Sequence, residues 1–348
     1  MNKHLIALAA LTLVSGMAAA QSSVTIYGNI DIGLLTQNKV AGGGSKTTMS
    51  GGGIAPSIWG FKGSEDLGGG LKASFNLEGH YAPDTGAMVG PFFRRQSNVG
   101  LSSANLGTLT LGNQYGPAVL AFAATDPRGL RENFSGLYSW AYNSGALTAG
   151  NNTNNDVGVF LKNAVSYSNT FGPIGVGAAY SASEKVNGSV YSLGLTYTGP
   201  VVLSAAYQTT NAPNTSKMIS KLYTLGAGYT MGDVTVKANY LHGLNKDTSF
   251  VETSKVSVFG LGLDWKTASN NTVTAAIYSG KDKLNTTDKT TTLILTDEYS
   301  LSKRTTLYGQ LAFANAKVGA TARTSVVAGG TVPDATTTLF NVGVKHSF

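Results

Sequence analysis

The chain ends with the stretch Leu339-Phe340-Asn341-Val342-Gly343-Val344-Lys345-His346-Ser347-Phe348. One parity carries Phe340, Val342, Val344 and Phe348, and His346 alone interrupts this apolar series. The other parity is mostly small or polar. Because successive side chains of a β-strand point to opposite faces, a period of two predicts a strand with one apolar and one polar face. The same pattern recurs along the chain, for example at residues 71–78 and 223–231.

Residues 1–20 have the features of a secretory signal peptide, so the domain of interest would span residues 21–348. Lys3 supplies a basic start, residues 5–14 form the apolar stretch, and residues 18–20 are three alanines that fit a cleavage site. The apolar stretch is shorter than the about 20 residues that a transmembrane helix needs. We therefore expect an exported protein.

The composition is compatible with many strands and excludes several classes of protein. The chain has 44 glycines, 12% charged residues and a mean hydropathy of +0.02. Membrane barrel strands give such neutral values because their polar and apolar residues alternate. The absence of cysteine excludes disulfides and thiolate metal sites. The net charge of +7 comes from scattered lysines and arginines, which gives little support to nucleic-acid binding.

Clusters of glycine, proline and polar residues divide the chain into alternating long and short connections. The long connections are residues 37–53, 81–91, 116–161, 182–188, 209–220, 243–254, 280–289 and 315–337. The short ones are residues 67–70, 105–107, 172–173, 199–200, 232–233, 270–271 and 302–304. Fifteen connections require sixteen strands. Because the series begins and ends with a long connection, both termini lie on the side of the short turns.

These observations predict an all-β fold, a 16-stranded antiparallel transmembrane β-barrel with lipid outside and water inside. We expect one domain, because a closed barrel leaves no sheet edge for a linker to interrupt. A soluble β-sandwich would show the same alternation around an apolar core. Aromatic residues near the predicted strand ends, such as Tyr229 and Trp265, favour the barrel because they fit girdles at the membrane interfaces.

Short motifs over the whole length after residue 20 carry a family resemblance. They are residues 22–31 (SSVTIYGNID), 59–68 (WGFKGSEDLG), 95–97 with 99–101 (RQS and VGL), 111–115 (LGNQY), 301–305 (LSKRT) and the terminal Phe348. With these motifs the chain resembles the Gram-negative general porins, closest to the β-proteobacterial type.

The resemblance implies a trimeric barrel in the outer membrane that lets small hydrophilic solutes and ions diffuse passively. It implies that the third external loop folds inward and narrows the pore. It also implies that Phe348 serves as the signal read by the outer-membrane assembly machinery. The expected partners are a second and third copy of the chain, outer-membrane lipid and lipopolysaccharide.

The longest connection, residues 116–161, is the candidate constriction loop. Loops beyond about 12–15 residues are uncommon and are usually functional or disordered. This one is rich in aromatic residues, and its aromatic half carries Asp126, Arg128, Arg131 and Glu132. In the porin pattern, acidic groups on this loop face basic groups on the wall. An ordinary surface loop with solvated charges is the alternative.

Strand parity supplies the candidate wall residues. Lys72 and Glu78 face the lumen if Leu71, Phe75 and Leu77 point outward, and the same argument places Lys62 and Lys162 inward. Arg94 and Arg95 are neighbours, so a regular strand would send them to opposite faces. Alternation favours Arg94, and the resemblance to the family motif favours Arg95; we expect Arg95 to face the lumen. Related porins often carry arginine at the position of Ile58. Its loss, with four basic wall candidates against three carboxylates, predicts at most a weak anion preference.

We expect neither enzymatic activity nor a bound metal or cofactor. After residue 20 the histidines are His80, His242 and His346, which fall in separate predicted strands or at strand ends, and there is no Gly-x-Ser-x-Gly motif. Zinc would need three or four close ligands. Two other functions of the same barrel remain open, a substrate-specific channel and an adhesin.

Overall fold

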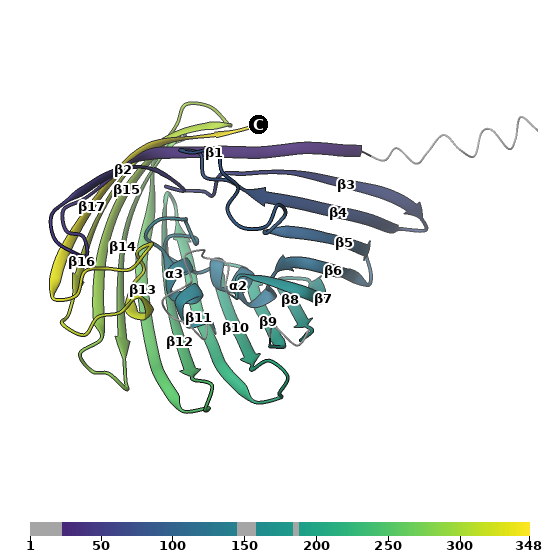
Figure 1. The fold of residues 1–348 in the computed structure, drawn as a ribbon. Coiled ribbons are helices and arrows are strands. Elements are labelled where there is room, and N and C mark those ends of the chain that lie inside the picture. Colours follow the sequence, from purple (N-terminus) through teal and green to yellow (C-terminus); the bar gives the residue numbers. More distant parts are fainter. Residues whose placement is uncertain (1–22, 145–157, 184–187) are drawn as a thin grey trace, which may run out of the picture.

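The computed structural model describes residues 23–144, 158–183 and 188–348. The predicted signal peptide lies outside the described residues. Nearly every element is a strand of one antiparallel sheet (Figure 1). The first strands are β1 Ser23–Gln37, β2 Lys46–Gly51, β3 Ile58–Gly68, β4 Leu71–His80, β5 Gln96–Ser103, β6 Gly107–Tyr115, β7 Phe160–Phe171 and β8 Ile174–Ser181. The later strands are β9 Val190–Thr198, β10 Val201–Asn211, β11 Met218–Met231, β12 Val234–Lys246, β13 Glu252–Ala268, β14 Asn271–Asp282, β15 Lys289–Ser300, β16 Thr305–Ala316 and β17 Ala335–Ser347.

The sheet closes into a barrel through β1. From β3 onward each strand pairs with the next along the chain, and β17 returns to pair with β1 from Asn29↔Ser347 to Gln37↔Leu339. The other half of β1 pairs with β3, from Ser23↔Ser64 to Asn29↔Ile58. Closure satisfies the backbone groups at both would-be edges, which a bilayer requires.

The described segments number seventeen because one barrel strand is interrupted. Both β2 and β3 pair with β1, at different levels, and residues 52–57 separate them. Counted together they give the sixteen strands that the connections predict. The sequence pattern predicts residues 37–53 wholly as a connection, because glycines flank the short Thr47-Thr48-Met49 run on both sides. The structure corrects this boundary, since β2 forms a hairpin with β1.

The two faces of the wall differ as the alternation predicts. Large apolar side chains such as Leu225, Phe259 and Leu293 are exposed, whereas residues at the alternate positions, such as Thr224, Thr292 and Thr296, are buried. We call the face with the buried polar side chains the inner face. Exposed aromatic residues form two rows on the outer face. Tyr180, Tyr191, Tyr207 and Tyr223 lie toward the long loops, and Tyr197, Tyr229, Trp265 and Tyr299 lie toward the short turns.

The described parts of the long connections contain three short helices. α2 (Pro117–Ala123) and α3 (Gly136–Asn143) follow β6, and the 3₁₀ helix η1 (Ala322–Thr324) precedes β17. α2 contacts β8 to β11, and α3 contacts β12, β13 and η1. None of the helices in the described ranges is long and apolar enough to cross a membrane.

Candidate functional site

The segment after β6 is held against the wall by hydrogen bonds to inner-face side chains. In α2, the backbone N–H of Ala118 donates to Ser192 Oγ of β9 at 3.1 Å. Just after the helix, the hydroxyls of Thr125 and Ser204 (β10) share a hydrogen bond of 2.6 Å. All four residues are almost fully buried. These contacts place the start of the long connection across β9 and β10.

Asp126 anchors the middle of this segment. Its side chain is completely buried, and its oxygens accept hydrogen bonds of 2.9–3.3 Å from the backbone N–H groups of Arg128, Leu130 and Gly136 and from the side chains of Asn239 (β12) and Tyr278 (β14). Burial raises the pKa of Asp126, and the hydrogen bonds oppose that shift. Asp126 therefore joins the segment to the far side of the barrel and does not face an open channel.

The two arginines after Asp126 extend these contacts to β15. Arg128 Nη1 donates to Thr296 Oγ1 at 2.8 Å, and Arg131 Nη2 forms an ion pair with Glu298 Oε2 at 2.8 Å. Arg128 is buried, whereas the Arg131 side chain is partly exposed. The charged side chains of this segment therefore contact β15, which lies far along the chain from β6, the strand that precedes the segment.

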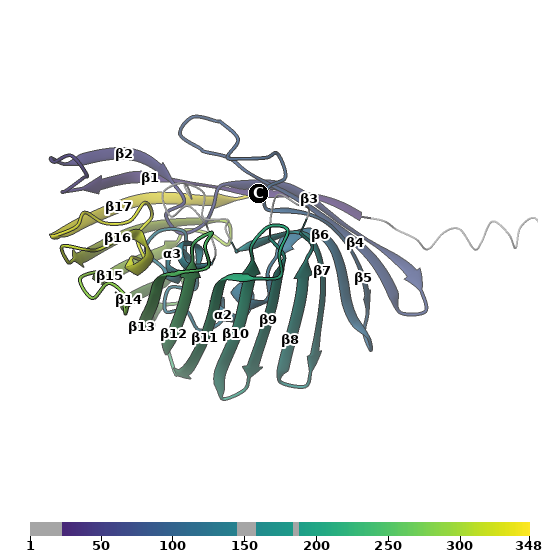
Figure 2. The same ribbon diagram turned by 60° about the horizontal axis from the view of Figure 1, so that its bottom comes forward.

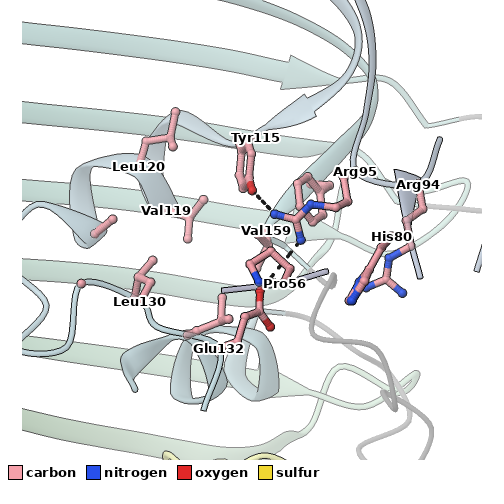
Figure 3. Close-up of a pocket in the computed structure, with 14 residues that line it drawn as sticks. Pro56, His80, Arg94, Arg95, Tyr115, Val119, Leu120, Leu130, Glu132 and Val159 are labelled. Carbon is pink, nitrogen blue, oxygen red and sulfur yellow. Dashed lines mark hydrogen bonds and ion pairs between the residues drawn. The ribbon is translucent and has the colours of Figure 1, made fainter. Parts of the chain in front are cut away.

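Arg95 lies at the centre of a charged and aromatic cluster (Figure 3). Its guanidinium donates to Glu78 Oε1 at 2.7 Å, bonds the Tyr115 hydroxyl, and lies 3.9 Å from Glu132 Oε1. It also lies over the Phe160 ring, 5.0 Å from the ring centre. Burial by itself would lower the pKa of Arg95. The neighbouring Tyr115, Glu132 and Glu78 raise this pKa by a larger amount, so it lies above its usual value and the group stays cationic.

This cluster borders a cavity of about 240 Å³ between the loop segment and the wall. Figure 3 shows Arg94 and His80 side by side at one end of it and Glu132 below Arg95. The remaining wall is largely apolar, formed by Val119, Leu120, Leu130, Leu137, Val159 and Phe160 among others. At roughly 30 Å³ per water, the cavity has room for about eight water molecules or one small solute.

A second group of charges lines two cavities nearer the short turns. Lys237 Nζ pairs with Asp264 Oδ2 at 3.2 Å, beside the Arg131–Glu298 pair. Lys266 lines both cavities, and Lys345 lines the second. Among the described residues, no carboxylate lies within 4.0 Å of the Lys266 or Lys345 ammonium group. Lys266 and Lys345 therefore add positive charge to these cavities without an ion pair to any described residue.

Comparison with known proteins agrees with this architecture. The model of the Gram-negative porin family matches residues 7–319. Outer membrane porin protein 32 of Delftia acidovorans is 34% identical over 369 residues, covering 100% of both chains. The chain belongs to the Gram-negative porin family. Among solved structures, an anion-selective porin from Comamonas acidovorans is 28% identical with a TM-score of 0.81, covering 94% of this chain and 100% of that one. The trimer form of OmpT from Vibrio cholerae shares the fold at 16% identity, with a TM-score of 0.69 over 94% of this chain and 99% of that one.

The porin is thus an outer-membrane β-barrel that forms a water-filled channel for passive diffusion. A barrel of this size encloses an aqueous lumen, because sixteen strands are too many for side chains alone to fill the interior.

The remaining predicted wall residues take different positions in the porin. Lys62 lies on the inner face with its ammonium 4.9 Å from the centre of the Tyr27 ring, and Tyr27 in turn donates to Glu78 at 2.9 Å. Lys72 is exposed and pairs in register with Asp66 beside a short turn. Lys162 is exposed at a bulge, where the register shifts between Gly112 and Gln114 of β6.

The bulge matters for Lys162 because it breaks the alternation. Gln114, whose side chain bonds the buried Ser166, pairs with Leu161, and Leu161 is buried against Ala164. Leu161, not Lys162, therefore shares the inner face with Ala164. The parity argument that turned Lys162 toward the lumen does not hold across this bulge.

Phe348, directly after β17, joins the last strand of the barrel to β1. Its backbone exchanges two hydrogen bonds with Gly28, of 3.0 and 3.2 Å. Its ring covers the same glycine so closely that a Cβ at position 28 would lie 2.6 Å from the ring. The half-exposed aromatic terminus is therefore packed onto β1.

The cavities are also lined by residues that the sequence pattern alone does not single out. They include Tyr115, Lys237, Asp264, Lys266, Glu298 and Lys345. Alternation could have indicated two of them. Lys237 and Lys266 each follow an outward-facing residue, Val236 and Trp265, so a regular strand turns both lysines inward. Parity gives the face of a side chain, but it does not tell which inner-face residues lie beside the loop.

Proposed function

We propose that this porin prefers anions mildly and that the segment after β6 folds into the lumen and forms its narrowest part. The observation that carries the anion preference is the charge around the three cavities. Seven cationic side chains line them, Arg94, Arg95, Arg128, Arg131, Lys237, Lys266 and Lys345. The carboxylates are Glu132, Asp264 and Glu298, with Glu78 bound to Arg95. The excess of three charges favours anions.

The preference is mild for two physical reasons. Arg95, Arg131 and Lys237 are each in an ion pair with a carboxylate, so their fields are partly cancelled. In addition, mobile salt screens charges over about 8–10 Å at physiological ionic strength. The anion-selective porin from Comamonas acidovorans, which shares the fold closely, supports the sign of the preference.

The inward position of the loop segment rests on its contacts. Ser192, Ser204, Asn239, Tyr278 and Thr296 all contact it, and all are buried inner-face residues of the wall. Figures 1 and 2 draw α2 and α3 on the concave side of the strands. A loop over the outside of the pore would leave these strand side chains in contact with water.

Planar-bilayer recording tests both parts. In a salt gradient, the reversal potential should have the sign of a weak anion preference, and a strong cation preference would contradict the charge assignment. Deletion of residues 125–135 removes the segment around Asp126 without touching a strand. The barrel should still assemble, because closure depends on strand pairing. Conductance and the exclusion limit for neutral sugars should rise, and an unchanged conductance would place the loop outside the pore.

We also propose that the porin is a homotrimer that associates through β16, β17 and β1–β6. Within the described ranges, the exposed Tyr and Trp side chains of the strands all lie on β7–β15: Tyr167, Tyr180, Tyr191, Tyr197, Tyr207, Tyr223, Tyr229, Trp265 and Tyr299. The opposite sector exposes mainly aliphatic residues such as Ile26, Val99 and Leu111. Aromatic girdles mark lipid contact, so the sector without one fits contact with other subunits. Unheated protein should migrate near three times the chain mass on a detergent gel; migration as a monomer would contradict the proposal.

A channel without catalytic activity fits the polar clusters best. His242 Nδ1 contacts Ser257 Oγ at 3.1 Å, the pair that a nucleophilic site would need. However, the charged groups that act on His242 are Lys221, Lys255 and Lys283, and no carboxylate orients the ring in the described part of the chain.

We further propose that Phe348 is the assembly signal, tested by comparing the folded yield of a Phe348→Ala variant with that of the parent.

A further inference from the structure

The inner face of the barrel is uncharged along one side of the wall. In the strands β5–β11 the charged residues are Lys162 and Lys221. Lys162 is exposed at the bulge, where Leu161 takes the inner face, and Lys221 shares the parity of the exposed Tyr223. Neither lysine therefore points into the lumen. We call the inner face of β5–β11 the neutral sector.

The charges of the inner face lie on the other strands of the wall. They include Lys62, Glu78, Lys237, Asp264, Lys266, Glu298 and Lys345, which belong to β3, β4, β12, β13, β15 and β17. A solute that crosses the lumen along the neutral sector therefore meets a different surface from one that crosses along these strands.

A fourth cavity, of about 740 Å³, lies against the neutral sector. It extends from α2 to the short turn between β5 and β6, and residues of β5–β9 form its wall. We call it the α2 cavity. Its volume lies within the range of about 300–1,000 Å³ that is typical of small-molecule sites. None of the described residues that line it is charged.

The wall of the α2 cavity offers hydrogen bonds to a solute. Four of its hydroxyls are accessible and form no hydrogen bond with the rest of the described chain, those of Thr108, Thr110, Ser168 and Thr196. The polar groups behind them are fixed, since Ser166 Oγ donates to Gln114 Oε1 at 2.5 Å. A hydroxyl both donates and accepts. The four hydroxyls can therefore exchange hydrogen bonds with the hydroxyls of a solute.

Helix α2 adds an apolar surface to the cavity. Leu120 lines it and is 54% exposed, whereas the neighbouring Val119 is buried. The helix contacts β8 and β9, and a Cβ at Gly177 of β8 would lie 2.8 Å from Pro117 Cβ. The helix is therefore packed closely against the wall. An apolar surface with a few polar groups is typical of sites that bind small molecules.

We propose that the α2 cavity binds neutral polyhydroxylated solutes, such as mono- and disaccharides, and that these cross the porin along the neutral sector, separately from anions. The wall hydroxyls bond the hydroxyls of the sugar, and Leu120 covers the carbon atoms of its ring. An inorganic anion gains no such advantage, because no cationic group there replaces the water that it would lose. The inference rests on the proposed inward position of the loop segment and does not depend on the proposed anion preference.

The test uses the full porin in planar bilayers, with sucrose on both sides as the probe. Sucrose in the α2 cavity narrows the lumen for ions. The conductance, corrected for the conductivity of the bulk solution, should therefore fall to a plateau as the sucrose concentration rises. The half-maximal concentration should be equal in about 0.1 M and about 1 M salt, because salt screens only charges. Tetraethylene glycol dimethyl ether, which has no hydroxyl, should bind at least about tenfold more weakly, since it cannot donate a hydrogen bond.

A pair of substitutions tests the wall hydroxyls. Thr110→Val with Thr196→Val keeps the shape and the β propensity of both side chains. It should raise the half-maximal sucrose concentration by about tenfold, because each lost hydrogen bond weakens binding by a modest factor. Thr272→Val with Thr306→Val is the matched control and should behave like the parent. These two threonines are also half-buried, but they line the charged cavities.

Three results would overturn the proposal: a sucrose effect without a plateau, a parent-like half-maximal concentration in the folded Thr110→Val with Thr196→Val porin, or an equal change in the control pair. Failures of the proposed function are measured separately. The sign of the reversal potential tests the anion preference, and both threonine pairs should keep the parent's value. The conductance of the protein without residues 125–135 tests the position of the loop.

Discussion

Replacing Asp126 by asparagine should loosen the loop segment without damaging the barrel. The substitution keeps the size of the side chain but turns one acceptor oxygen into a donor. If the amide nitrogen takes the place of Oδ2, the backbone N–H of Leu130 loses its acceptor, whereas the N–H of Arg128 keeps a second one, the Tyr278 hydroxyl at 3.1 Å. If it takes the place of Oδ1, the N–H of Gly136 loses its acceptor. Either orientation leaves at least one backbone donor of this segment without its partner, Leu130 N–H in the first case and Gly136 N–H in the second.

The size of the effect follows from that donor. A buried group that loses its hydrogen-bond partner costs about 1–3 kcal/mol, which corresponds to a roughly 5- to 150-fold shift in the equilibrium between docked and undocked loop. The strands lose little, because Asn239 and Tyr278 belong to ladders that are complete without Asp126. We therefore expect the loop, and not the barrel, to respond.

Single-channel recording measures this shift directly. The Asp126→Asn channel should spend a correspondingly larger fraction of time in a state of higher conductance, with more current noise than the parent, while its heat resistance on a detergent gel stays the same. Asp247→Asn is the matched control: Asp247 accepts from the backbone N–H groups of Ser249 and Val251 at 2.8 and 3.0 Å but is only partly buried, on another loop. Parent-like noise and conductance in a folded Asp126→Asn protein would refute the anchoring role.

Three further outcomes are expected. Arg95→Gln should shift the reversal potential toward cations by the same amount at pH 6 and pH 9. Neighbouring groups raise the pKa of Arg95, so its side chain is charged at both pH values. A shift that disappears at pH 9 would contradict this prediction. Lys266→Gln combined with Lys345→Gln should abolish most of the anion preference, measured as the reversal potential. The size limit for neutral sugars, measured by liposome swelling, should stay unchanged. An anion preference equal to the parent's would show that other residues set the selectivity. Gly28→Ala should lower the yield and heat resistance of the folded barrel, because its Cβ would lie 2.4 Å from the Ile58 carbonyl oxygen and 2.6 Å from the Phe348 ring. Phe348→Ala in the same chain should relieve the part of that loss that comes from the ring. No defect in Gly28→Ala would show that the contact between β1 and the C-terminus tolerates the methyl group.

The barrel itself could be predicted because its pattern is local. A strand in a lipid-facing sheet must alternate, and the turns between strands must contain residues that reverse the chain. Those rules act on neighbours in the sequence, and the sixteen strands predicted from them are confirmed. They failed at residues 46–51, where glycines on either side hid a short strand within a predicted connection.

Local rules were also insufficient where the backbone departs from a regular strand. Arg94 and Arg95 precede β5, so alternation does not apply to them, and both line the same cavity. At Lys162 a bulge reverses the expected parity. In each case the face of the side chain depends on backbone geometry that residue type alone does not reveal.

By itself the sequence determined a two-faced strand repeated sixteen times, its family and the connection that carries the charged loop. Only the tertiary structure decided what the charges of that loop do. Asp126 and Glu132 are equivalent in the sequence, yet Asp126 is buried against Tyr278, 152 positions away, while Glu132 lies beside Arg95. Periodicity assigns a side chain to a face, but closing the barrel sets which faces meet, and that depends on contacts between residues far apart in the chain.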